Sequence, residues 1–358
     1  FMVARDTDGF SQELVASIER ERAYLASTGH NGPLPPASLL AISGGGDNGA
    51  FGAGLLTGWT VRGTRPSFKV VTGVSTGALI APFAFLGSDY DPVLQQVYTN
   101  SSQRDIFRKR GILRGFFGDA MADTTPLYRL IERYVDRQML DAIGAEYLKG
   151  RVLLVGTTNF DALEPVIWNM TAIAASKDDR ALPLFRRILL ASASIPGAFP
   201  PVMIDVEAGG ERYQEMHVDG GAMAQVFAYP PSLHVAEQAA ALHLERRRTL
   251  YIIRNARLDP DWSNVERRTL PIAVRAIGSL TQTQGIGDLY RIFAISQRDG
   301  VDFNLAYIPA SFSVPHKEEF DTIYMRQLFA TGHEMAVAGY RWEKVPPGYD
   351  RARLSSAP

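Results

Sequence analysis

The stretch FKVVTGVSTGALIAPFAFL, residues 68–86, contains the feature that decides the fold. An apolar run ends at Val74, a Gly-x-Ser-x-Gly sequence follows at residues 73–77, and small and apolar residues come after it. This order predicts a buried strand, a sharp turn at Ser75 and a helix over residues 76–86. A serine on such a strained turn needs small neighbours, and the helix N-terminus stabilises negative charge beside it. The pattern therefore predicts Ser75 as a nucleophile rather than as an ordinary turn residue.

A glycine run precedes this stretch, in SGGGDNGAFGAG, residues 43–54. It follows a predicted buried strand and leads into a predicted helix over residues 49–59. Consecutive glycines expose backbone N–H groups, which suits either a phosphate site or an oxyanion hole. The Lys-Ser/Thr pair of a Walker loop is absent, and Gly44-x-Gly46-x-x-Gly49 lacks the acidic residue that a dinucleotide site requires after its second strand. The run favours an oxyanion hole, with nucleotide binding as an alternative that predicts thermal stabilisation by nucleotide.

A carboxylate follows a later predicted strand, in HVDGG, residues 217–221. That strand ends at Val218, Asp219 follows it directly, and the two glycines after Asp219 indicate a backbone turn. Alone, such an aspartate is more typical of an Asx-type turn than of a catalytic group. Together with Ser75 and the glycine run, it completes a nucleophile, oxyanion donors and a base, which are the parts needed for acyl transfer.

Short apolar runs alternate with helical patterns through most of the chain, which predicts a parallel α/β sheet covered by helices. Sites in such sheets collect at the carboxyl ends of the strands, where the glycine run, Ser75 and Asp219 fall. Further strands are predicted over residues 151–159, 249–254 and 301–308. Further helices are predicted over residues 10–27, 125–149, 184–193, 270–289 and 320–342.

No internal repeat or low-complexity tract divides the chain. A loop rich in glycine and proline, residues 29–36, separates the first predicted helix from the first strand. After about Pro260 the pattern becomes less regular. We therefore predict a helical arm and linker over residues 1–36, a catalytic domain over 37–260, and a C-terminal α/β extension packed on it over 261–358.

A fourth block, ASASIPGAFPP, residues 191–201, lies between the Ser75 and Asp219 motifs. The four blocks, in this order, resemble those of the patatin-like phospholipases: a glycine-rich loop, Gly-x-Ser-x-Gly, an Ala-Ser-x-x-Ile-Pro-x-x-Phe-Pro-Pro stretch and Asp-Gly-Gly/Ala. The resemblance implies a three-layer α/β/α patatin-like sandwich with a mainly parallel central sheet. Neither the N-terminal arm nor the chain beyond about Ala222 carries a matching motif.

The resemblance also implies a reaction, namely hydrolysis of fatty-acyl esters of phospholipids or other lipids. It makes Ser75 the nucleophile and Asp219 its base, a dyad without histidine. The oxyanion hole then falls on the amides of Gly44, Gly45 and Gly46, and neither a cofactor nor a metal is needed. Because a free carboxylate has a pKa near 4 and is a poor base, we expect burial to raise the pKa of Asp219.

The sequence departs from the family pattern at one position beside the glycine run. Asn48 stands where the family often carries Arg or Lys, which is expected to weaken anion affinity near the oxyanion hole while leaving a possible hydrogen-bond donor. The adjacent Asp47 is expected to cap the following helix.

The six histidines leave a Ser-Asp-His triad as an alternative to the dyad. His217 shares a strand face with Asp219 and is interpreted as structural. The histidines that follow Asp219, in the order of an α/β-hydrolase triad, are His234, His243, His316 and His333. A catalytically silent lipid-binding or interaction protein with the same fold is a further alternative, as is a general short-chain esterase or thioesterase.

Composition limits the other classes of function. A formal net charge of −1 gives no basis for nucleic-acid binding, and the absence of cysteine excludes disulfides, a thiol nucleophile and thiolate metal sites. No apolar run reaches the roughly 18 residues of a membrane span. The resemblance implies a lipid or ester substrate, met at a membrane or micelle interface, as the partner. The oligomeric state stays open.

Three segments carry weaker expectations. The chain opens with Phe1-Met2, so we expect that a signal or anchor sequence was removed, and an exported or envelope-associated location stays open. Residues 107–117 mix aromatic and basic side chains, typical of a packed surface loop or of a lid that contacts lipid. Residues 246–248, three arginines, are interpreted as a solvated charge run.

Overall fold

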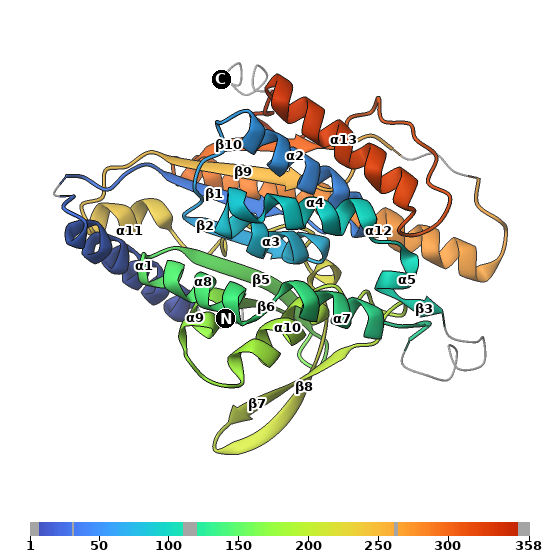
Figure 1. Cartoon of the computed structure of the whole chain (residues 1–358), viewed down its shortest axis with the longest axis horizontal. Helices are drawn as coiled ribbons and strands as arrows, with labels where there is room; N and C mark the ends of the chain where they lie inside the picture. Colours follow the sequence, from blue (N-terminus) through green and yellow to red (C-terminus); the bar gives the residue numbers. More distant parts are fainter. Residues whose placement is uncertain (1–6, 31, 110–119, 261–263, 350–358) are drawn as a thin grey trace, which may run out of the picture.

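The computed structural model describes residues 7–30, 32–109, 120–260 and 264–349. A central sheet lies between helices on both faces, as Figure 1 shows. The sheet order is β10-β9-β1-β2-β5-β8-β7, and β6 also pairs with β5. The strands are β1 (Ala37–Ile42), β2 (Val70–Val74), β5 (Val152–Asn159), β6 (Glu164–Asn169), β7 (Val202–Ala208), β8 (Glu211–Asp219), β9 (Arg248–Arg254) and β10 (Asp302–Tyr307).

The strands from β10 to β5 are parallel to one another, whereas β6, β7 and β8 join by antiparallel pairing. The expected mainly parallel sheet within an α/β/α sandwich is confirmed. The β7–β8 hairpin differs from the prediction, because the sequence predicted only one short strand in this region, ending at Val218. Its outer half, around Tyr213, is exposed and polar, so it lacks the apolar alternation that marks a strand.

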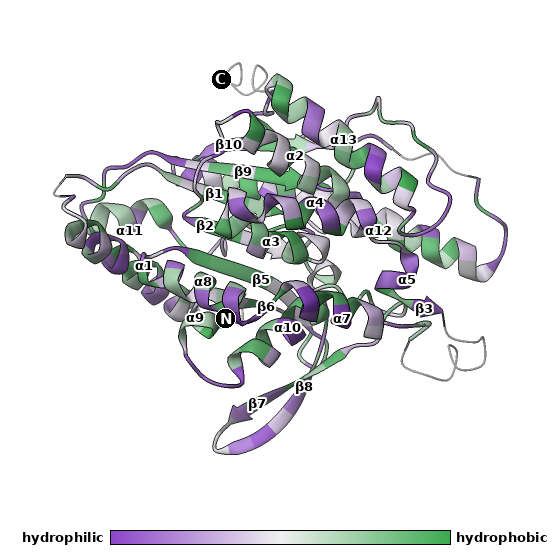
Figure 2. Ribbon diagram, viewed as in Figure 1, coloured by the Kyte–Doolittle hydropathy of each residue, from purple (hydrophilic) through white to green (hydrophobic). Residues whose placement is uncertain are grey.

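Alternate residues of the central strands point to opposite faces, which separates two cores. Leu40 and Ile42 of β1 face one core, while Ala41 faces the other. The first core packs α2 (Gly49–Val61), α3 (Thr76–Leu86), α4 (Asp91–Asn100), α7 (Thr125–Tyr134), α8 (Arg137–Leu148), α9 (Met170–Ala175), α10 (Ala181–Ser192) and α13 (Thr322–Ala338). The second packs α1 (Thr7–Ser27), α11 (Val235–Ala241) and α12 (Thr269–Arg298). Figure 2 shows apolar colour concentrated on the inner strands.

Short elements complete the described chain. They are η1 (Gly46–Asn48), η2 (Ser88–Tyr90), α5 (Gln103–Ile106), β3 (Arg108–Lys109), β4 (Ala122–Asp123) and η3 (Gly220–Ala222). The expected lid or surface loop at 107–117 falls largely on residues 110–119, outside the described residues.

Small residues on α2 let α13 cross it at close range. A Cβ at Gly54 would lie 2.0 Å from the Phe329 carbonyl oxygen, and one at Gly58 would lie 2.3 Å from that of His333. The glycines therefore serve a close backbone approach. α13 ends at Ala338, earlier than expected, because Gly339 adopts φ 97° in the left-handed region and closes the helix.

The C-terminal part contributes to the same sheet as the motifs. β10 pairs with β9, which in turn pairs with β1, and α12 connects β9 to β10. The division of the chain at residues 36 and 260 stays a prediction. Within the described ranges, no helix is long and apolar enough to cross a membrane.

Candidate active site

Ser75 occupies the junction of β2 and α3 in a strained backbone conformation. Its φ of 55° and ψ of −126° lie where a residue with a side chain is rarely found. A Cβ at Gly73 would lie 2.4 Å from the Gly77 carbonyl oxygen, and one at Gly77 would lie 2.2 Å from that of Ile42. Both flanking glycines are therefore required by close packing, as the Gly-x-Ser-x-Gly pattern predicts.

Ser192, in the block at residues 191–201, holds the Ser75 turn from behind. The Ser75 amide donates a hydrogen bond of 3.0 Å to Ser192 Oγ, and Ser192 Oγ donates one of 2.7 Å to the Gly156 carbonyl oxygen. Ser192 is fully buried at the end of α10. The sequence marked this block only by family resemblance, and the structure gives its second residue a physical role.

Sheet register brings Asp219 level with Ser75. Val74 pairs with Gly156 of β5, so Ser75 lies level with Thr157, and Thr157 pairs with Asp219 of β8. The Ser75 turn and the Asp219 carboxylate thus lie on the two sides of β5. This placement requires β8 to run antiparallel to β5, a pairing that the sequence did not reveal.

The Asp219 carboxylate is buried and carries a raised pKa. Burial is the largest cause and raises the pKa to about 6, against hydrogen bonds from the Ser75 side chain and the Gly221 amide that lower it. The Gly221 N–H to Oδ1 distance is 2.7 Å. The Asp219 amide donates to the Ser194 carbonyl oxygen at 2.8 Å, which fixes the end of β8.

The glycine run lies directly against Ser75. A Cβ at Gly44 would lie 3.2 Å from Ser75 Cβ, and Gly45 and Gly46 adopt φ values of 151° and 58°. The Gly44 N–H already donates to the Gln225 carbonyl oxygen at 3.0 Å. Among the described residues, the amides of Gly45 and Gly46 have no such acceptor.

Asn255, just after β9, fixes the glycine run through both its backbone and its side chain. Its amide donates to Ser43 Oγ at 2.8 Å, and its Nδ2 donates to the Ser43 carbonyl oxygen at 3.0 Å. Its Oδ1 accepts the Gly52 N–H at 3.0 Å. A Cβ at Gly45 would lie 2.2 Å from the Asn255 carbonyl oxygen. Sequence reasoning missed this fully buried residue, whose only signal is a polar side chain at the end of an apolar strand.

The expectation that Asp47 caps a helix is wrong. Its carboxylate accepts hydrogen bonds from His316 Nε2 at 2.6 Å and from the Phe320 amide at 2.8 Å. The Tyr324 hydroxyl donates to Asn48 Oδ1 at 2.6 Å. Asp47 and Asn48 therefore connect the glycine run to the C-terminal segment. The donors to the Asp47 carboxylate come from that segment and not from the backbone amides of a helix N-terminus.

None of the six histidines hydrogen-bonds to Ser75 or Asp219; all six lie within the described residues. The nearest in sequence, His217, is buried and contacts Thr157 Oγ1 and Glu215 instead. His234 contacts Glu237, and His333 stacks on Phe329. In the ranges that the structure describes, no group of three or more metal-binding side chains occurs either.

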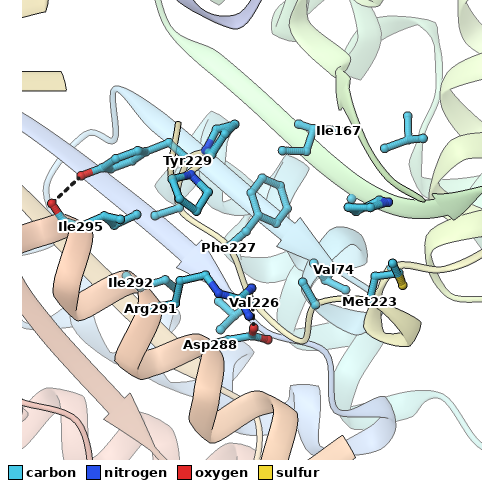
Figure 3. Close-up of a pocket in the computed structure, with 18 of the residues that line it drawn as sticks. Val74, Ile167, Met223, Val226, Phe227, Tyr229, Asp288, Arg291, Ile292 and Ile295 are labelled. Atoms are coloured by element: carbon cyan, nitrogen blue, oxygen red, sulfur yellow. Dashed lines mark hydrogen bonds and ion pairs between the residues drawn. The ribbon is translucent and has the colours of Figure 1, made fainter. Parts of the chain in front are cut away.

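An apolar cavity of about 110 Å³ lies beside the site. Val74 and Gly220, the neighbours of Ser75 and Asp219, line it together with residues of α12. Figure 3 shows Val74 and Met223 on one side of Phe227, with Ile292 of α12 on the other. Neither Ser75 nor Asp219 lines the cavity itself, so it adjoins the residues next to them in the sequence.

The protein has an α/β fold with a strained serine on a strand-to-helix turn, and a comparison with known families identifies its class. The family model described as patatin-like phospholipase matches residues 40–230, more than half of the 358 residues. The chain belongs to the patatin-like phospholipase family, which implies hydrolase activity on lipid esters.

Solved structures add weaker similarity. VipD from Legionella pneumophila is 11% identical, with 86% of this chain and 67% of that chain covered and a TM-score of 0.41. The type III effector protein ExoU is 14% identical, with 87% of this chain and 55% of that chain covered and a TM-score of 0.32. No curated protein sequence matches significantly.

Proposed function

We propose that this protein hydrolyses fatty-acyl esters of lipids with Ser75 as nucleophile and Asp219 as base. One observation carries the proposal: a serine on a strained strand-to-helix turn lies beside a buried carboxyl group, its side chain lowers the pKa of that group, and burial raises this pKa to about 6. Nucleophile and base within hydrogen-bond reach are the signature of covalent catalysis. The patatin-like phospholipase family match over residues 40–230 supports a lipid ester as the substrate.

In the first step, Asp219 accepts the proton of the Ser75 hydroxyl as Ser75 Oγ attacks the ester carbonyl carbon. A carboxylate with a pKa of about 6 is a stronger base than one in water and is still ionised at neutral pH. The proton then passes from Asp219 to the leaving alkoxide. Water then attacks the acyl carbonyl carbon while Asp219 accepts a proton from it. The bond between the acyl carbon and Ser75 Oγ breaks, the fatty acid leaves, and the proton passes from Asp219 to Ser75 Oγ.

The oxyanion of each tetrahedral intermediate would be held by backbone amides of the glycine run. The Gly45 and Gly46 amides are the better candidates, because the Gly44 N–H is donated to the Gln225 carbonyl oxygen. Gly44 would take part only after that bond opens. Each oxyanion donor is typically worth about two to three orders of magnitude in turnover.

The test is a hydrolysis panel of phospholipids, triglycerides and short nitrophenyl esters, with Ser75→Ala as the blank. We expect release of fatty acid or nitrophenol by the natural sequence and none above background by the variant. Absence of hydrolysis across the panel, together with no fluorophosphonate labelling of the folded protein, would support the catalytically silent alternative.

A further inference from the structure

The two halves of α12 have opposite environments. In the second half, Leu289, Ile292 and Phe293 are buried in the core beneath the sheet. In the first half, every residue from 272 to 280 is exposed. Burial against the body therefore explains only the second half.

The exposed half carries large apolar side chains on the side that faces away from the protein. Ile272, Ile277 and Leu280 are 53%, 63% and 70% exposed. At 3.6 residues per turn, Ile277 and Leu280 lie about 60° apart around the helix axis and Ile272 lies about 80° from Leu280, so the three share one side of the helix. Gln282, on another face, hydrogen-bonds to Arg254 and to the Arg257 carbonyl oxygen. The exposed apolar residues therefore lie away from the side of α12 that contacts the body. Figure 2 shows apolar colour on the projecting part of α12.

Topology places this half at the edge of the sheet that holds Ser75. α12 connects the parallel strands β9 and β10, so it begins beyond their carboxyl ends. In Figure 1 it extends past the same edge toward which the arrow of β5 points. Two other exposed apolar residues occur near this edge: Ile195 follows Ser194, the contact of Asp219, and Met223 lines the cavity.

Basic residues surround the start of this helix. Arg267, Arg268 and Arg275 are exposed, Arg268 lies 3.6 Å from the Glu266 carboxylate, and the first turn holds no acidic residue. Positive charge at a helix N-terminus opposes the helix dipole, so it does not help the helix. An apolar face flanked by arginines complements an anionic lipid surface, where the side chains enter the acyl region and the arginines meet the headgroups.

We propose that residues 267–280 form a docking element that binds the surface of an anionic lipid bilayer and sets the Ser75 edge against it. Docking of this kind is independent of the dyad chemistry. It explains why a helix half with apolar side chains is left outside the core.

The experiment is cosedimentation of the full chain with vesicles of phosphatidylcholine and phosphatidylglycerol, for the natural sequence and for Ile277→Glu with Leu280→Glu. We expect the double variant to lose at least about tenfold in vesicle affinity. The matched control is Leu148→Glu, because Leu148 is 67% exposed at the end of α8, before β5 and at the opposite edge of the sheet. That control should bind like the natural sequence.

Two measurements keep the test decisive. Hydrolysis of a short soluble ester should be unchanged in the double variant, which separates failure of docking from failure of the proposed reaction and shows that the variant is folded. Equal vesicle binding by the double variant and the natural sequence would overturn the proposal. A dimer in size-exclusion chromatography that the double variant dissociates would also overturn it, because the apolar face would then belong to a second copy.

Discussion

Residues 40–230 and the segment from Asn255 to Tyr324 contribute to the candidate site in different ways. The first region carries the groups that we propose react, Ser75 and Asp219, and it contains every sequence motif. The second holds the glycine run in place, through Asn255 on Ser43 and Gly52 and through His316 on Asp47. It carries no motif.

The difference has a physical reason. A reacting group must have one chemistry at one place, so it leaves a short pattern such as Gly-x-Ser-x-Gly. A group that positions a loop acts through the tertiary fold, and several side chains could supply the same hydrogen bond. If this account holds, substitutions in the first region should remove catalysis, and those in the second should weaken it in proportion to the bonds lost.

The largest effect is expected for Asp219→Asn. An amide cannot accept the Ser75 proton as a base, so kcat/KM for a soluble ester should fall by about three orders of magnitude. Steady-state hydrolysis measures it, with His217→Ala as a control for the neighbouring buried histidine. Near-normal turnover by Asp219→Asn alongside inactivity of a histidine variant would replace the dyad with a triad.

The next effect is expected for Asn255→Ala. The change removes the Nδ2 and Oδ1 bonds to the glycine run, so kcat should fall by about two orders of magnitude with a smaller change in KM. Some loss of stability accompanies it, because the Ser43 carbonyl and Gly52 amide lose buried partners. Turnover is therefore measured per folded molecule.

Asn304→Ala is the matched control for this change. Asn304 is a buried asparagine on the adjacent strand β10, and its Nδ2 donates to the Leu250 carbonyl oxygen rather than to the glycine run. It should lose stability without the same loss of kcat. Equal losses of kcat in both variants would show that Asn255 has no specific effect on the site.

The pH dependence of kcat/KM also tests the first region, and the expected change is smaller than that for Asn255→Ala. Asp219 acts as a base only when ionised, and its pKa is about 6, so kcat/KM should fall about tenfold per pH unit below that value. If kcat/KM for a soluble ester is the same from about pH 5 to about pH 7, Asp219 does not act as the base.

The same shift has a consequence for stability. The folded pKa lies above the usual value of 3.8, so the folded state binds more protons between these values, and the contribution of Asp219 to stability falls as pH rises from about 4 to about 6. Asp219→Asn should remove this part of the pH dependence of unfolding.

The smallest effect is expected for His316→Ala. His316 is partly exposed and is one of two donors to Asp47, so the Phe320 amide keeps the carboxylate partnered after the change. We expect a loss of kcat of less than about tenfold. His234→Ala, which removes an exposed histidine paired with Glu237, is the control, and a loss as large as that of Asn255→Ala would contradict the ranking.

The sequence predicted much of the fold because apolar strands, glycine-marked turns and amphipathic helices follow local rules. β1, β2, α3 and β5 fall close to their expected residues. The β7–β8 hairpin escaped because its exposed residues lack apolar alternation, and the end of α12 was placed too early, at residue 289 instead of 298. Asp47 was misread because local rules favour a cap, whereas its donors come from more than 260 positions away in the chain.

The central claim is that Ser75, positioned by the glycine run and activated by Asp219, is the nucleophile. Its most direct test is reaction with a fluorophosphonate probe followed by mass spectrometry to locate the modified residue. The account predicts one modification, on Ser75, that forms much more slowly in Asp219→Asn and is absent in Ser75→Ala. Modification of a different serine in an ester-hydrolysing protein, or an unchanged labelling rate in Asp219→Asn, would contradict it.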